Sequence, residues 1–167
     1  MSQLIIFLAQ YFIVIDLLLA GIYVIYLFKN KKTIFIKLAK LSILSLPISY
    51  LSAKILQHVI NDPRPFVVNH AIKPLFAHAP DNGFPSDHTL LTMTVAAIIF
   101  SYNRKLGILL ALFSLVIGFA RVAAGVHHSL DIIGAAVIAI AATALSFFVL
   151  QYIAGKKEDK SIKLHNK

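Results

Sequence analysis

The sequence predicts an all-α integral membrane protein, a bundle of about five transmembrane helices with the N-terminus outside and the C-terminus in the cytoplasm. Two observations predict the class. The 167-residue chain is 59% hydrophobic, with a mean hydropathy of +0.81, and its apolar residues form runs long enough to cross a bilayer. A third observation, the uneven distribution of Lys and Arg, predicts the orientation. The length suits one domain.

The first apolar run covers residues 4–28 and is interrupted mainly by Gln10 and Asp16. At 1.5 Å per residue it reaches roughly 37 Å, enough to cross a bilayer with some tilt. It is longer than the apolar core of a signal peptide, so we expect a retained helix. The other spans are expected at residues 33–60, 88–102, 106–125 and 130–153. Residues 1–154 thus form the predicted membrane domain, and residues 155–167 a basic cytoplasmic tail.

Residues 61–85 form a long polar loop that holds five of the six prolines. Twelve of the sixteen Lys and Arg residues lie at the span ends opposite this loop. The positive-inside rule therefore places the loop outside the cytoplasm. The outer side carries six of the seven histidines and four aspartates. Such a set indicates a site rather than general solvation.

Composition excludes several other classes of protein. The net charge of +9 is typical of nucleic-acid binding, but the apolar runs favour a bilayer, and we expect no nucleic-acid partner. Cysteine is absent, which excludes a disulfide framework and a thiolate site. The basic tail is expected to fix the topology and contact anionic membrane lipids.

Polar residues of the outer face gather in three segments. They are residues 62–65 (Asp-Pro-Arg-Pro), residues 85–88 (Pro-Ser-Asp-His), and Arg121 with His127 and Asp131. Ser86 is a good N-cap, so a helix starting there would direct its free N–H groups outward as an anion site. Asp131, four residues after His127, could accept the Nδ1–H and leave Nε2 as a nucleophile. If the last helix starts at Ser129, this pairing requires the loop to bend back.

Each segment also has a simpler interpretation. Ser86 could be an ordinary cap beside a solvated His88, and Arg121 could snorkel to the membrane interface. Asp131 could merely favour a helix N-terminus. Together, however, guanidinium groups, helix N–H groups and two histidines are what phosphoryl transfer requires.

These residues resemble the motifs of the type 2 phosphatidic-acid phosphatase superfamily, which includes the vanadium haloperoxidases. The family pattern is Lys-x6-Arg-Pro, Pro-Ser-Gly-His and Ser-Arg-x5-His-x3-Asp. The third part matches at residues 121–131, with Ala120 in place of Ser. The second matches with Asp87 in place of Gly, as in the bacterial undecaprenyl-diphosphatase branch. The first keeps Arg64-Pro65 but has Gln57 at the lysine position, and Lys54 lies one helical turn earlier.

The resemblance implies a role for each matched residue. His127 would attack phosphorus and form a phosphohistidine, Asp131 would orient it, and His88 would protonate the leaving oxygen and then activate water. The phosphate oxygens would be held by Arg64, Arg121, Ser86 and Lys54. No metal or cofactor is implied. The substrate would be a lipid phosphate or diphosphate, foremost undecaprenyl diphosphate, hydrolysed to undecaprenyl phosphate at the extracytoplasmic, periplasmic face of the bacterial inner membrane.

Other interpretations stay open at this stage. The substrate could be phosphatidylglycerol phosphate, phosphatidic acid or lipid A, and a phosphotransferase would use the same phosphohistidine. A degenerate, non-enzymatic member and a zinc hydrolase are further alternatives, although no H-E-x-x-H pattern exists. Asp16, within the first span, is either functional or hydrogen-bonded to a Ser or Tyr of a neighbouring helix. His58, His70 and His78 are expected to be ordinary loop residues. The sequence leaves the oligomeric state unknown.

Overall fold

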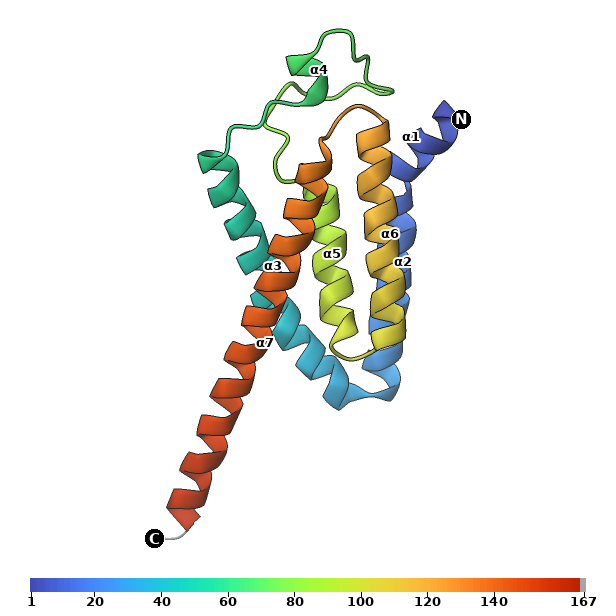
Figure 1. Cartoon of the computed structure of the whole chain (residues 1–167). Coiled ribbons are helices and arrows are strands. Elements are labelled where there is room, and N and C mark those ends of the chain that lie inside the picture. The colour runs from blue at the N-terminus through green and yellow to red at the C-terminus, as the bar shows by residue number, and fades with distance from the viewer. Residues whose placement is uncertain (166–167) are drawn as a thin grey trace.

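The computed structural model describes the backbone of residues 1–165 and the side chains of residues 1–156. Every regular element in that part of the chain is a helix (Figure 1). In order they are α1 (Ser2–Gln10), α2 (Phe12–Asn30), α3 (Lys32–Val59), α4 (Pro65–Val68), α5 (Asp87–Phe100), α6 (Arg104–Ala123) and α7 (Ser129–His165). The predicted all-α membrane fold is confirmed.

Four helical segments have the length and hydropathy of membrane spans: residues 2–30, 32–59, 104–123 and 129–156. The first combines α1 and α2, which are separated only at Tyr11. The last helix, α7, continues to His165, so the basic tail expected from residue 155 begins inside a helix. The side chains of residues 157–167 lie outside the described part, and the cytoplasmic position of this tail remains a prediction.

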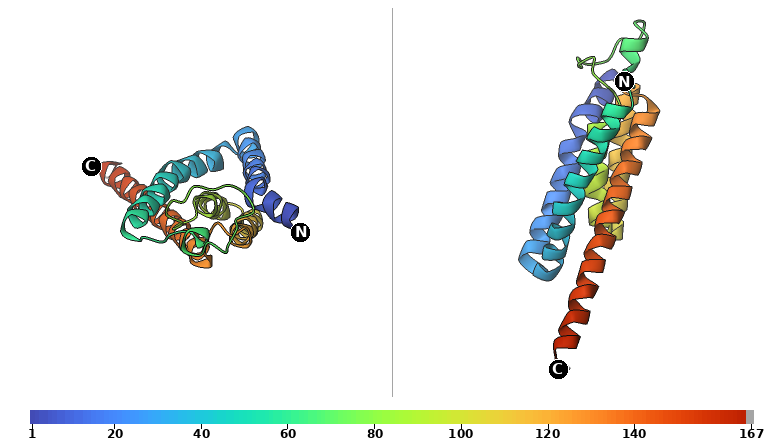
Figure 2. Two further views of the ribbon diagram at one scale, coloured as in Figure 1. Left: turned by 90° about the horizontal axis from the view of Figure 1, so that it is seen from above. Right: turned by 90° about the vertical axis from the view of Figure 1, so that its left-hand side faces the viewer.

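The remaining span, α5, is short and central. Its 14 residues reach ~21 Å, less than the roughly 30 Å of a bilayer hydrocarbon core. Figure 2, seen from above, shows α5 in the middle, with α2, α3, α6 and α7 around it and the outer loop across its end. Eight of its residues are buried. Because most of α5 packs against other helices rather than lipid, it does not have to match the bilayer thickness.

Small and hydroxyl-bearing residues allow this close packing. Thr92 Oγ1 lies 2.7 Å from Ser114 Oγ on α6, and Ser49 Oγ on α3 lies 2.8 Å from Thr94 Oγ1. A Cβ added at Gly118 of α6 would lie 2.5 Å from Ile132 Cγ2 and 2.8 Å from Thr89 Oγ1. Glycine at this position therefore lets α5, α6 and α7 meet closely, just below the ends that carry the three motif segments.

Asp16 lies inside the bundle, away from those motif segments. Its side chain is fully buried, and neither carboxylate oxygen has a hydrogen-bond partner among the described residues. The expected hydrogen bond to a Ser or Tyr of a neighbouring helix is therefore wrong.

Candidate active site

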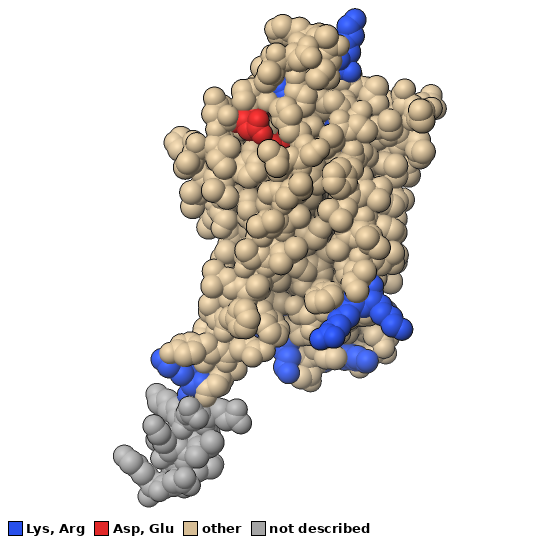
Figure 3. Space-filling model, viewed as in Figure 1, with Lys and Arg blue, Asp and Glu red and all other residues tan. Residues whose placement is uncertain are grey.

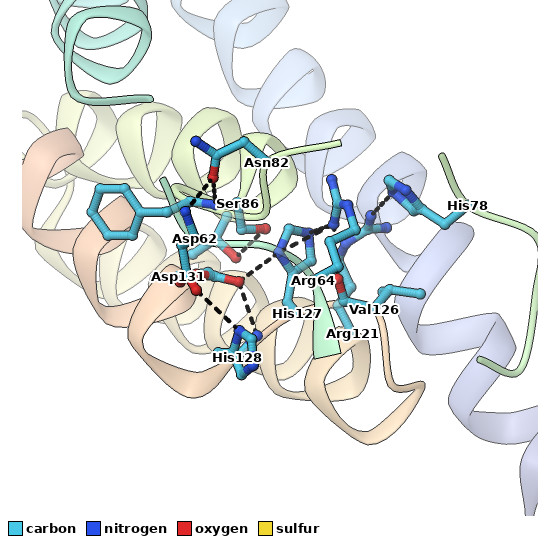
Figure 4. A network of polar contacts seen from close by, with 12 residues as sticks. Asp62, Arg64, His78, Asn82, Ser86, Arg121, Val126, His127, His128 and Asp131 are labelled. Carbon is cyan, nitrogen blue, oxygen red and sulfur yellow. Dashed lines mark hydrogen bonds and ion pairs between the residues drawn. The ribbon is translucent and has the colours of Figure 1, made fainter. Parts of the chain in front are cut away.

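The outer end of the bundle is closed by residues 60–86, which include α4 and connect α3 to α5 (Figure 1). An isolated backbone bridge between Pro63 and Asn82 closes this loop on itself. The Asn82 side chain donates to the carbonyl oxygens of Gln57 and Ile60, at 2.8 Å and 2.5 Å. The loop is thereby tied to the end of α3, and Figure 4 shows its residues beside those from α6 and α7.

Arg64 comes directly before α4, where Pro65 occupies the first helical turn, a favoured position for proline. Its side chain is only 5% exposed. Nη1 donates to the Val126 carbonyl at 2.8 Å, and Nε donates to Asp81 Oδ1 at 2.7 Å. The guanidinium therefore joins the outer loop to the turn between α6 and α7.

Ser86 is the N-cap of α5, as the sequence predicts, but its hydroxyl makes no capping hydrogen bond. The Ser86 N–H instead donates to the Asp131 carbonyl oxygen at 3.2 Å. His88 lies in the first turn of α5 and is half-buried. The N-terminal end of α5, where a helix attracts anions, therefore lies against the start of α7.

Arg121, near the C-terminal end of α6, is 3% exposed. Nη1 donates to the carbonyl oxygen of Ala9 in α1 at 3.2 Å, and Nη2 lies 3.1 Å from His78 Nε2. Its Nε has no partner among the described residues. Such burial disagrees with an arginine that snorkels to the membrane interface.

His127 and Asp131 form the predicted pair. The turn after α6 passes through Gly125 at φ +78°, a conformation that glycine favours, and α7 begins at Ser129. The loop bends back: Nδ1 of His127 lies 3.0 Å from Asp131 Oδ2, and the same oxygen accepts the His128 N–H at 2.8 Å. The second contact is that of an N-terminal helix cap. The helix-start interpretation of Asp131 and the pairing interpretation are therefore both correct.

The pairing determines the tautomer of His127. Because Nδ1–H donates to the carboxylate, Nε2 carries the lone pair, and Arg64 Nη1 lies 3.2 Å from it. Burial lowers the pKa of His127 below its ordinary value, and the charges of Arg121 and Arg64 lower it further, against the opposing effect of Asp131. The ring is therefore neutral near pH 7, with Nε2 facing the Arg64 guanidinium.

Lys54, the proposed substitute for the missing motif lysine, lies on the last turns of α3. Nζ donates to Gln57 Oε1 at 2.9 Å and lies 3.9 Å from Asp87 Oδ1 at the start of α5. Within the described part of the chain, Lys54 forms no hydrogen bond with Arg64. Lys54 thus reaches toward the N-terminal end of α5, and its contact with phosphate remains a prediction.

The expectation that His58, His70 and His78 are ordinary loop residues is wrong for His78. His70 is an exposed loop residue, as expected, and His58 is also exposed but belongs to the last turn of α3. His78, by contrast, packs edge-to-face against His127, with ring centroids 6.2 Å apart, and contacts Arg121. Asp81 forms the ion pair with Arg64. No periodicity or motif spacing marks these positions, because only the closure of the loop brings them to the site.

A group of potential metal-binding side chains, Asp62, His128 and Asp131, has its ligand atoms within 4.8 Å of one another. His128 Nδ1 lies 3.5 Å from Asp62 Oδ1. In Figure 4 this group lies on the opposite side of His127 from Arg64 and Arg121. Asp131 Oδ2 is already bonded to His127 and to the His128 N–H. The group therefore lies on the Nδ1 side of the His127 ring, where Asp131 binds it.

The fold and the sequence both have known counterparts. The crystal structure of LpxE from Aquifex aeolicus superimposes with a TM-score of 0.63 at 24% identity, covering 87% of this chain and 93% of that one. This chain is 42% identical over 79 residues to undecaprenyl-diphosphatase BcrC of Bacillus subtilis, a match covering 47% of this chain but only 40% of that relative. It is 33% identical over 135 residues to the putative undecaprenyl-diphosphatase YbjG of Escherichia coli, covering 80% of this chain and 66% of that one.

The family profile of the PAP2 superfamily matches residues 38–154, more than half of the chain. The matched stretch contains all three motif segments and the helices that hold them together. This chain therefore belongs to the PAP2 superfamily.

Proposed function

We propose that this protein is a lipid phosphatase that acts through a phosphohistidine at His127 and that its main substrate is undecaprenyl diphosphate. The observation that carries the proposal is the setting of His127. Asp131 holds Nδ1 at 3.0 Å, and Nε2 faces Arg64 at 3.2 Å. The two relatives named as undecaprenyl-diphosphatases support the choice of substrate.

In the first step, Nε2 of His127 attacks the terminal phosphorus. The N–P bond forms as the bond between phosphorus and the leaving oxygen breaks, and His88 gives that oxygen a proton. Asp131 stabilises the imidazolium that develops. Arg64, Arg121 and the helix start at Ser86 hold the non-bridging oxygens as charge shifts onto them. The leaving group is the lipid monophosphate.

In the second step, water attacks the phosphohistidine. His88, now neutral, takes a proton from the water as its oxygen bonds to phosphorus, and the N–P bond breaks. The products are orthophosphate and neutral His127, so the site returns to its starting state. Two guanidinium groups supply the charge that metal ions supply in many phosphoryl transfers. The reaction is therefore expected to proceed in EDTA.

The proposal places this chemistry at the extracytoplasmic face of the bacterial inner membrane. Figure 3 shows most of the visible Lys and Arg side chains at the end of the molecule opposite the outer loop, with a smaller group at the loop end. The loop end is the one that the positive-inside rule assigns to the outside. A carrier-lipid diphosphate presented on that side of the membrane would reach His127 there.

The test is phosphate release by the purified protein from undecaprenyl diphosphate, phosphatidylglycerol phosphate and phosphatidic acid, with and without EDTA. We expect release in EDTA, fastest with the diphosphate. His127→Ala should lose several orders of magnitude in turnover, as expected for a missing nucleophile. His70→Ala, which changes an exposed histidine of the outer loop, should have no effect.

Labelled substrate should also leave an acid-labile, base-stable phosphoryl group on the wild-type protein and none on His127→Ala. A His127→Ala protein that keeps more than about a tenth of the activity would remove His127 as the nucleophile. Activity that EDTA abolishes and zinc restores would favour a metallohydrolase instead.

A further inference from the structure

The outer loop places two polar side chains on the two arginines of the site. Asp81 Oδ1 accepts from Arg64 Nε at 2.7 Å. Three residues earlier, His78 Nε2 lies 3.1 Å from Arg121 Nη2. Figure 4 shows His78 at the guanidinium side of the cluster. One short loop segment therefore contacts both groups that are proposed to hold phosphate.

The hydrogen bonds indicate which nitrogen of His78 carries its proton. Nδ1 lies 3.2 Å from the Ala79 carbonyl oxygen, which can only accept, so Nδ1 is the donor. Nε2 then has a lone pair, which accepts from Arg121 Nη2. The His78 ring also stands edge-to-face to the His127 ring at 6.2 Å. His78 is thus a neutral acceptor next to the proposed nucleophile.

Both arginines donate to a lone pair of the loop, Arg64 to an oxygen of Asp81 and Arg121 to a ring nitrogen of His78. A phosphate provides several such oxygens and more negative charge than one carboxylate. Asp81 is 58% exposed, so moving it into water costs little, whereas Arg64 is anchored through Val126. A phosphate can therefore replace the loop side chains while the arginines stay in place.

We propose that His78 is a further phosphate-binding residue: an incoming phosphate displaces Asp81 from Arg64, and His78 takes up a proton from solvent and donates a hydrogen bond from Nε2 to a phosphate oxygen. This inference rests on the proposed function only in naming the ligand as a phosphate group. No covalent bond changes, and the only species taken up with the phosphate is that proton.

The charges around His78 agree with this exchange. The groups that face it are Arg121 from α6, Arg64 before α4, His127 from the α6–α7 turn, His88 from α5 and Asp81 from its own loop. Burial lowers the pKa of His78 below its ordinary value; the hydrogen bond to Ala79 opposes this effect, the charges of Arg64 and Arg121 lower the pKa further, and Asp81 raises it. A phosphate between the arginines reverses their effect, and the pKa of His78 rises when phosphate is bound.

The experiment measures binding of inorganic phosphate to the detergent-purified full chain by calorimetry at about pH 6 and about pH 8, on either side of the histidine range. His78→Ala should weaken phosphate binding about tenfold at the lower pH, as expected for loss of a charged hydrogen bond, and less at the higher pH. His78→Gln can donate a hydrogen bond but cannot become charged. Its phosphate affinity should lie between those of wild type and His78→Ala, without the pH-dependent gain that wild type shows. Free phosphate titrates in the same way in every measurement, so the ratio of wild-type to variant affinity removes this contribution.

Asp81→Asn should change the phosphate affinity in the opposite direction. It removes the carboxylate that competes for Arg64, so phosphate should bind more tightly. His70→Ala serves as the matched control and should equal wild type. The inference is overturned if His78→Ala binds phosphate as wild type does at both pH values, if Asp81→Asn weakens binding in parallel with His78→Ala, or if wild type binds no phosphate. Should His78→Ala fail to fold, His78→Gln and Asp81→Asn decide the question.

The two proposals can fail separately. If wild type binds phosphate with the expected pH dependence but hydrolyses no lipid phosphate, the proposed function fails and the assignment of His78 stands. If lipid hydrolysis depends on His127 while the His78 and Asp81 variants do not change phosphate binding, the assignment of His78 fails and the phosphatase stands.

Discussion

Asp131 uses a single carboxylate oxygen for two tasks. Oδ2 accepts from the His127 ring and from the His128 N–H, so the start of α7 and the orientation of His127 depend on the same side chain. The histidine is only 3% exposed, and its tautomer directs Nε2 toward the guanidinium of Arg64. At the scale of single residues, then, the site combines a neutral imidazole with neighbouring cations.

This setting predicts the acid limb of the pH profile. Only neutral His127 can attack phosphorus, so kcat/KM falls as the pH drops through the pKa of His127 in the free enzyme. Burial holds that pKa below the ordinary value of 6.5. We therefore expect the acid limb below pH 6.5, measured as kcat/KM across pH with the lipid's own titration determined separately. An acid limb above this value would contradict the neutral buried ring.

Lys54 provides a second prediction at this scale. Its ammonium lies 3.9 Å from Asp87, the first residue of α5, close to the proposed anion site. We expect Lys54→Met to lower kcat/KM by about one order of magnitude, in line with ~1.5–3 kcal/mol for a charged hydrogen bond reduced by partial solvent exposure. Adding Gln57→Lys should restore part of the loss.

Lys73→Met, in the exposed outer loop, is the matched control for removal of a positive charge. If neither Lys54→Met nor Lys73→Met changes kcat/KM with any lipid tested, Lys54 does not bind phosphate. The oxygens would then be held by Arg64, Arg121 and the start of α5 alone.

Among the helices, α5 carries Ser86 and His88 at its N-terminal end to the site. It is too short to cross a bilayer unaided, yet its N-terminus must meet the turn between α6 and α7. Its burial among the other helices allows the short length. Most of the large apolar side chains that face outward lie on the surrounding helices, such as Leu18 of α2, Ile43 of α3 and Leu112 of α6.

The contact at Gly118 allows a direct test of this packing. Gly118→Ala should separate α6 from Thr89 and Ile132, which its Cβ would approach at 2.8 Å and 2.5 Å. Overpacking of this kind costs about 1–3 kcal/mol, so we expect a lower melting temperature in detergent and reduced activity. The matched control is Gly21→Ala in α2, where a Cβ meets nothing within 4 Å. It should be neutral or slightly stabilising, because alanine favours a helix. Equal melting temperatures for the two variants would contradict the close contact.

For the molecule as a whole, the two ends differ in chemistry. The loop end holds the buried side chains of Arg64, Arg121 and His127, whereas the opposite end carries most of the Lys and Arg side chains visible in Figure 3. The two ends of the molecule therefore differ in the way expected for the two sides of a membrane. The orientation of the protein can be tested without measuring catalysis.

The chain has no cysteine, so single introduced cysteines report their side of the membrane cleanly. His70→Cys, exposed in the outer loop, should label with a membrane-impermeant maleimide in intact cells. Lys31→Cys, exposed between α2 and α3, should label only after the membrane is opened. The reverse pattern would place the site in the cytoplasm and remove an extracytoplasmic substrate.

The sequence by itself determined the class of the protein and most of its site. Long apolar runs require membrane helices because a bilayer leaves backbone groups no other partners. The pairing of His127 with Asp131 is local, four residues apart at the start of α7, so it could be predicted. Ser86 was also predictable as the helix start because serine is a favoured N-cap residue, although its hydroxyl makes no capping hydrogen bond.

Only the tertiary structure decided which distant residues meet. His78 and Asp81 reach the arginines because Asn82 fastens the loop to α3 and Pro63 pairs with Asn82, contacts that no periodicity in the sequence reveals. The contact of Lys54 with Asp87 and the isolation of Asp16 likewise depend on how helices pack, because both involve elements that are far apart in sequence. The local hydrogen bonds of the turn were encoded in the order of residues, whereas the loop that completes the site was positioned by the bundle.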